Sequence, residues 1–159
     1  MKKIPSFTVN HDDLCRGIYV SRQDAVGSEL VTTFDVRTKL PNREPVMNTA
    51  EIHAMEHLAA TFLRNHSVYA DQTIYFGPMG CRTGFYIILK GDLKSEDVIS
   101  LVTETFEFIA AYEGEIPGAS SRDCGNYLDM NLPMAKYEAK QFLENTLTKL
   151  TANNLVYPE

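Results

Sequence analysis

The chain has 159 residues, and its 15 lysines and arginines against 21 aspartates and glutamates give a formal net charge of −6. This acidic balance, without a block of basic residues, argues against nucleic acid as a partner. Hydrophobic residues make up 44% and charged residues 23%, which is ordinary for a globular protein and excludes wholesale disorder. A chain of this length usually forms one compact domain, so we expect residues 1–159 to be a single domain.

Nothing in the sequence indicates secretion or a membrane. The longest apolar run, residues 86–89, is far shorter than the roughly 20 residues that span a bilayer, and no signal peptide begins the chain. Three scattered cysteines, Cys15, Cys81 and Cys124, are poor material for a disulfide framework. We therefore expect a cytoplasmic protein with reduced thiols, in which cysteines are more often metal-binding or catalytic than structural.

The first half of the chain predicts a strand, a loop and a helix. Residues 30–37 alternate, with Asp35 and Arg37 on the face opposite Phe34, as in a half-buried strand. Residues 38–47 contain two prolines and should form a loop. A helix is expected from residue 48 or 49 to about 65, because Asn48 and Glu51 have the spacing of a capping box.

The second half predicts two strands followed by two helices. Residues 69–76 and 84–90 are rich in tyrosine, phenylalanine and isoleucine, and a turn is expected at residues 77–80 between them. Helices are expected over about 95–112 and from about Pro133 through Leu147 and Leu150. Strands and helices without regular βαβ alternation predict an α+β fold, an antiparallel sheet with helices packed on one face.

The strongest chemical signal is His53-Ala54-Met55-Glu56-His57 within the first predicted helix. Histidines four residues apart project from one helix face, so both imidazoles can bind one metal ion at about 2.0–2.1 Å. Glu56 flanks the same face and has the position of a general base. The pattern is also the inverted H-x-x-E-H motif of zinc peptidases. The alternative is a helix that exposes two histidines and a glutamate by chance.

A catalytic metal site usually has three protein ligands and an open position. Cys124, in a polar segment between two predicted helices, is the best third candidate, whereas His66 reads better as a cation at a helix C-terminus. Cys81 follows the predicted turn and precedes Arg82, whose charge favours a thiolate. A buried, inert thiol is the alternative for Cys81, and we expect Cys15 to be of that kind.

These residues resemble the S-ribosylhomocysteine lyase (LuxS) family. The resemblance covers essentially the whole chain, with the blocks in the family's order and near its spacing. The P-M-G-C-R-T-G-F-Y motif at residues 78–86 is highly specific. The other matching blocks are residues 6–7 with His11, residues 34–37, residues 53–66 and residues 124–125.

The resemblance implies roles for individual residues. The metal, Fe²⁺ in the cell and often Zn²⁺ in purified protein, would be held by His53, His57 and Cys124. The two acid–base groups would be Glu56 and Cys81.

The resemblance also implies substrate contacts from Ser6, His11 and Arg37 and a homodimer with active sites at the interface. The implied reaction cleaves the thioether of S-ribosylhomocysteine into homocysteine and 4,5-dihydroxy-2,3-pentanedione, the precursor of the quorum-sensing signal autoinducer-2. For the thiolate to leave from the carbon β to a ketone, the sugar carbonyl must first migrate through enediolates.

One residue departs from the family pattern. The family commonly has aspartate six residues before the reactive cysteine, where this chain has Tyr75. The polar contribution of that aspartate is either lost, replaced by the phenol of Tyr75, or supplied by a nearby residue such as Asp71. The main alternative function is an inverted-motif metallopeptidase, in which Cys81 and Cys124 would have no role. A structural metal domain is the non-catalytic alternative, but a closed site needs four ligands.

Overall fold

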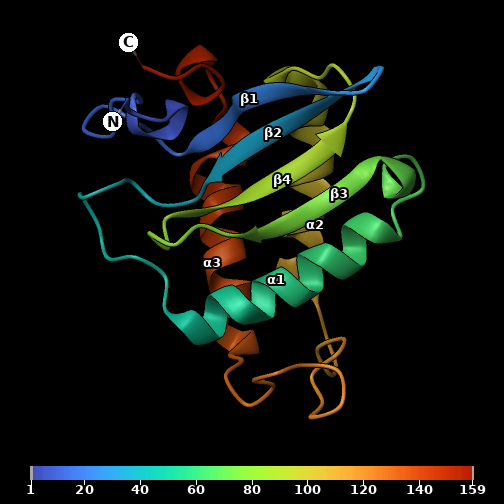
Figure 1. Ribbon diagram of the computed structural model, residues 1–159. Helices are drawn as coiled ribbons and strands as arrows, with labels where there is room; N and C mark the ends of the chain where they lie inside the picture. Colours follow the sequence, from blue (N-terminus) through green and yellow to red (C-terminus); the bar gives the residue numbers. More distant parts are fainter. Residues whose placement is uncertain (1, 159) are drawn as a thin grey trace.

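The computed structural model describes residues 2–158 and has one four-stranded antiparallel sheet, ordered β1-β2-β4-β3, with three helices on one face (Figure 1). This confirms the expected α+β fold. No helix within residues 2–158 combines the length and the apolar character needed to cross a membrane. The elements are β1 (Gly17–Val26), β2 (Glu29–Arg37), α1 (Thr49–Arg64), β3 (Thr73–Pro78), β4 (Gly84–Lys90), α2 (Ile99–Ala111) and α3 (Leu132–Asn145).

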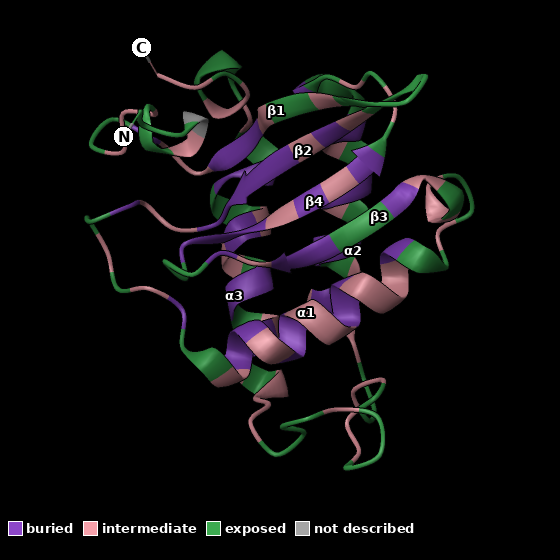
Figure 2. Cartoon of the chain, in the orientation of Figure 1, coloured by how far each residue is buried: buried purple, intermediate pink, exposed green. Residues whose placement is uncertain are grey.

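The core lies between the sheet and the helices. Phe34 and Ile87 are paired across β2 and β4 and are both buried in this core, as the alternation of β2 predicts. On the other face of β2, Asp35 and Arg37 are only 2% and 3% exposed, so the expectation of a half-exposed strand is wrong at this end (Figure 2). The physical reason is that the two side chains pair with each other.

The strand boundaries around β3 differ from those expected. Residues 70–72 form a 3₁₀ turn, in which the carbonyl of Tyr69 accepts bonds from both the amide and the hydroxyl of Thr73, at 3.0 and 2.8 Å. β3 then continues through Pro78, so the turn begins later than residue 77. Pro78 is tolerated because β3 is an edge strand, where a missing N–H costs no ladder bond. β1 was not predicted.

The helices follow the capping signals closely. The predicted capping box of α1 is present, with Glu51 Oε1 accepting the amide of Asn48 at 2.6 Å. A 3₁₀ turn at Ser95–Val98 precedes α2. α3 begins after Asn131, whose side chain accepts the amide of Met134, but it ends at Asn145. The expected extension through residues 147 and 150 is therefore wrong, because a separate 3₁₀ turn follows.

Replacement of Phe106 by alanine tests the packing of this core. Phe106 is fully buried on α2 and its ring meets that of Phe142 on α3 edge-on, with centroids 4.9 Å apart. Phe106→Ala should lower the free energy of unfolding by about 3–5 kcal/mol in urea denaturation, because it leaves a cavity. Val68→Ala, at a side chain that is 63% exposed, should change it by less than about 0.5 kcal/mol. A loss below about 1 kcal/mol for Phe106→Ala would contradict this packing.

Candidate active site

Helix α1 separates an apolar face from a face that carries the H-x-x-E-H motif. Its buried residues include Met55 and Leu58, which join the core, and the helix contacts β3, α2 and α3. His53, Glu56 and His57 are half-buried and line a cavity between α1 and the long loop that joins α2 to α3. The packing of one helix face therefore fixes the direction of the three side chains on the other.

Cys124 lies on that loop and completes a cluster of three metal-binding groups. The ligand atoms of His53, His57 and Cys124 all lie within 4.8 Å of one another. Cys124 Sγ is 3.3 Å from His53 Nε2, and the two imidazole rings are nearly perpendicular at 74°. The three groups can therefore converge on one ion, and the structure brings together the ligands predicted from the sequence.

Backbone carbonyls of the loop orient both imidazoles. His53 Nδ1 donates to the carbonyl of Asp129 at 3.0 Å, and His57 Nδ1 donates to the carbonyl of Pro117 at 2.7 Å. A carbonyl only accepts, so each Nδ1 carries a proton, and Nε2 is the nitrogen of each ring that can offer a lone pair to a metal ion. This outer bonding is the usual way in which proteins fix a metal-binding tautomer.

The loop needs a glycine to approach His57 so closely. Gly118 has φ of +72°, and a Cβ atom there would lie 3.2 Å from His57 Nδ1. The amide of Cys124 donates to the carbonyl of Ser120 at 3.0 Å, which sets the position of the sulfur. Two nitrogens and one thiolate suit zinc or iron and leave a fourth position open, so the residues present fit a divalent metal.

Glu56 lines the same cavity but is outside the ligand cluster. Among residues 2–158 its carboxylate has no hydrogen-bond partner, and it faces the space beside the two imidazoles. It is therefore free to accept or return a proton.

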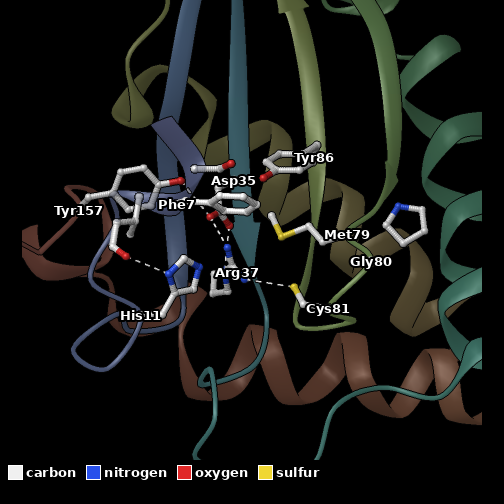
Figure 3. A pocket seen from close by; sticks show the side chains of 12 residues that line it. Phe7, His11, Asp35, Arg37, Met79, Gly80, Cys81, Tyr86 and Tyr157 are labelled. Carbon is white, nitrogen blue, oxygen red and sulfur yellow. Dashed lines mark hydrogen bonds and ion pairs between the residues drawn. The ribbon is translucent and has the colours of Figure 1, made fainter. Parts of the chain in front are cut away.

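Cys81 lies in a different cavity of about 340 Å³, on the face of the sheet that the helices leave uncovered. Figure 3 shows the Arg37 side chain between Asp35 and Cys81. Ser6 and His11 line the same cavity, so the structure brings these two residues together with Arg37 and Cys81. Its size is in the range of small-molecule sites.

The environment of Cys81 favours the thiolate. Burial raises the pKa of this thiol, but hydrogen bonds from the side chain and backbone of Thr83 and the charge of Arg37 outweigh burial, so the pKa is lowered. Cys81 Sγ is 3.1 Å from Thr83 Oγ1 and 3.7 Å from the Nη1 of Arg37, which donates to it. The sequence suggested Arg82 as the cation, whereas the structure provides Arg37.

Several residues of this cavity were not singled out as functional from the sequence. Asp35 accepts from Arg37 with both oxygens, at 3.1 and 2.5 Å, and Tyr157 donates to Asp35 at 2.9 Å. Asp35 belongs to the block of residues 34–37 that resembles the family, which could have marked it as functional. No local sequence pattern indicates a functional role for Tyr157. Neither Tyr75 nor Asp71 lines the Cys81 cavity, so neither takes the place of the family's aspartate there.

The remaining histidine and cysteine have structural surroundings. His66 Nδ1 accepts the amides of Val68 and Tyr69, and His66 Nε2 donates to Glu104 at 3.0 Å. Through these bonds His66 caps the chain after α1, and it lines neither the metal cavity nor the Cys81 cavity. Cys15 lines neither the metal cavity nor the Cys81 cavity.

Comparison with known proteins gives one consistent result. The sequence profile of the S-Ribosylhomocysteinase (LuxS) family matches residues 4–153. The chain is 66% identical to an S-ribosylhomocysteine lyase of Clostridium beijerinckii, over 99% of this chain and 99% of the relative. It is 62% identical to one of Finegoldia magna and 60% identical to one of Clostridium acetobutylicum, over 100% of both chains in each case.

The ligand cluster predicts that removal of the Cys124 sulfur weakens metal binding. Cys124→Ala should bind Zn²⁺ at least about tenfold more weakly than the unmodified chain, since losing a ligand costs more than losing an outer-shell contact. Titration against a competing chelator measures this. Cys15→Ala is the matched control and should bind as the unmodified chain does. Equal affinity of Cys124→Ala and Cys15→Ala would remove Cys124 from the ligand set.

Proposed function

This chain belongs to the S-ribosylhomocysteinase (LuxS) family, and from that premise we propose that it cleaves the thioether of S-ribosylhomocysteine, giving homocysteine and 4,5-dihydroxy-2,3-pentanedione. The chain is thus a carbon–sulfur lyase. The observation that carries this proposal is the convergence of His53, His57 and Cys124 beside the free carboxylate of Glu56. A metallopeptidase would leave the cavity around Cys81 without a role.

The reaction needs proton transfers more than it needs a strong nucleophile. The sugar carbonyl must move from C1 to C3, because sulfur on C5 becomes a leaving group only when it is β to a ketone. Each shift takes a proton from one carbon and returns a proton to its neighbour through an enediolate. Finally a base removes the C4 proton, the C5–S bond breaks, and its electron pair leaves with homocysteine thiolate.

Two side chains of different type suit these transfers. The Glu56 carboxylate has no hydrogen-bond partner among residues 2–158, and the pKa of Cys81 is lowered, so both groups are placed to exchange protons with a substrate. His53, His57 and Cys124 would hold one divalent ion per subunit, Fe²⁺ or Zn²⁺ in its place, which when bound supplies a Lewis acid for the sugar oxygens.

Ser6, His11 and Arg37 are proposed to bind the substrate, because all three line the cavity that contains Cys81. Most N–H groups of Arg37 donate to protein atoms, so only part of one edge of its guanidinium can bind a ligand. The product would cyclise to autoinducer-2, and we propose a cytoplasmic location, consistent with the reduced cysteines.

A homodimer is proposed because one chain does not unite the two halves of the site. The cavity around His53 and the cavity around Cys81 share no lining residue. The uncovered sheet face carries a hollow lined in part by Ile4, Tyr75 and Ile88, and the first two are 52% and 44% exposed. A second copy covering this face would bury apolar surface and could bring its metal cavity to Cys81 of the first.

Incubation with S-ribosylhomocysteine tests the activity directly. Metal-replete protein under anaerobic conditions should release homocysteine, measured by titration of the new thiol. Cys81→Ala should abolish release while keeping its metal content, since Cys81 is outside the ligand cluster. Cys15→Ala should release thiol at the normal rate. Full activity of Cys81→Ala would refute its role in proton transfer, and no release by the unmodified protein would refute the assignment.

Mixed subunits test the shared site. His57→Ala and Cys81→Ala should each be inactive alone, but co-expressed chains should recover roughly a quarter of normal activity, since half of random dimers are mixed and one of their two sites is intact. The recovery is measured as thiol release per mole of subunit. If each site lay within a single chain, the mixture would stay inactive.

A further inference from the structure

A continuous chain of hydrogen bonds joins the C-terminal segment to Cys81. The hydroxyl of Tyr157 donates to Asp35 Oδ2 at 2.9 Å, and the same oxygen accepts from Arg37 Nη2 at 2.5 Å. Arg37 Nη1 in turn donates to Thr83 Oγ1 at 2.5 Å and to Cys81 Sγ at 3.7 Å. Figure 3 shows Tyr157, Asp35, Arg37 and Cys81 around one cavity.

The middle of this chain is deeply buried. The side chains of Asp35 and Arg37 are 2% and 4% exposed, so water contributes little to holding their geometry. Both Asp35 oxygens accept from Arg37, an arrangement that requires the ionised carboxylate. A change in the hydrogen bonds to Asp35 therefore shifts the guanidinium of Arg37, whose Nη1 contacts Cys81 Sγ.

Tyr157 is itself held in place. Its ring stacks on that of Tyr19 with centroids 4.8 Å apart and 13° between the planes. The hydroxyl of Tyr19 lies 3.0 Å from the carbonyl oxygen of Cys15 and 3.1 Å from that of Asn153, and these two acceptors share its single proton. Burial, followed by the charge of Asp35, raises the pKa of Tyr157, so its hydroxyl stays protonated and remains a donor.

We propose that Tyr157 is a positioning residue for Cys81: its hydroxyl holds the carboxylate of Asp35, which holds the guanidinium of Arg37 against the thiol. The catalytic meaning of this arrangement rests on the proposed function, whereas the arrangement itself does not. Tyr157 lies beyond the residues 4–153 that match the family profile, and it belongs to none of the sequence blocks on which the family resemblance was based.

Removal of the Tyr157 hydroxyl has two effects, and both raise the pKa of Cys81. Asp35 loses a donor that offsets part of its negative charge, and the ion pair gains freedom to turn away from the sulfur. The ionisable and polar groups around Cys81 and this ion pair are Arg37 and Asp35 on β2, Thr83 and Tyr86 near β4, Ser6 and His11 before β1, Ser21 and Arg22 on β1, and Tyr157. Only the last is altered in Tyr157→Phe, which keeps the stacked ring.

The pH dependence of alkylation measures the effect without substrate. Metal-loaded protein is treated with iodoacetamide from pH 5 to 10, and modification of the Cys81 peptide is followed by mass spectrometry. Tyr157→Phe should raise the midpoint by roughly half a unit to one unit, which slows alkylation about threefold to tenfold below the midpoint. Tyr137→Phe, at an exposed tyrosine of α3 without a hydrogen-bond partner within residues 2–158, should leave it unchanged.

A second variant separates positioning from loosening of the terminal segment. Ser95 Oγ donates to the carbonyl of Leu155 at 2.9 Å, so Ser95→Ala loosens the same segment without touching the bonds to Asp35. We expect Ser95→Ala to keep the normal midpoint. An unchanged midpoint in Tyr157→Phe, or an equal rise in both variants, would overturn the proposal. Lack of thiol release by the unmodified protein would instead refute the proposed function and leave the midpoints unaffected.

Discussion

The apolar face of α1 packs into the core, and the metal half of the site depends on that contact. Met55 and Leu58 are fully buried, so the helix cannot rotate without exposing them to water. His53 and His57 must then project toward the loop between α2 and α3, where two backbone carbonyls accept their Nδ1 protons. Burial of one helix face and two hydrogen bonds thus orient both rings before any ion binds, which lowers the cost of binding.

The other half of the site depends on a buried charge pair. Removing Asp35 and Arg37 from water is costly, and three sets of hydrogen bonds offset that cost: those between the two side chains, the one from Arg37 to Thr83 and the one from Tyr157 to Asp35. An ion pair of this kind is weak evidence for stability, but it fixes a guanidinium beside a thiol. The consequence of this buried ion pair is a cysteine with a lowered pKa on the uncovered face of the sheet.

The two halves differ in how they are supported. The proposed metal ligands come from a helix and a loop bonded to that helix, whereas Cys81 follows an edge strand and faces the uncovered side of the sheet. Such a division suits the proposed dimer, in which each half of the site would be prearranged within its own chain and association would supply the geometry between them. The proposed contact would also cover the exposed apolar residues Ile4 and Tyr75.

The sequence by itself determined the features that depend on residues close together in the chain. Helix periodicity put His53, Glu56 and His57 on one face, the capping box marked the start of α1, and alternation separated Asp35 and Arg37 from Phe34. The sequence favoured Cys124 as a ligand. It could not show that Cys124 lies beside His53, because the two residues are 71 positions apart in the chain. Only the tertiary structure decided that Arg37 is the cation beside Cys81 and that Tyr157 reaches Asp35 across 122 residues. Local patterns report the period of a helix or strand, whereas these contacts arise from how the sheet, loops and terminal segment pack.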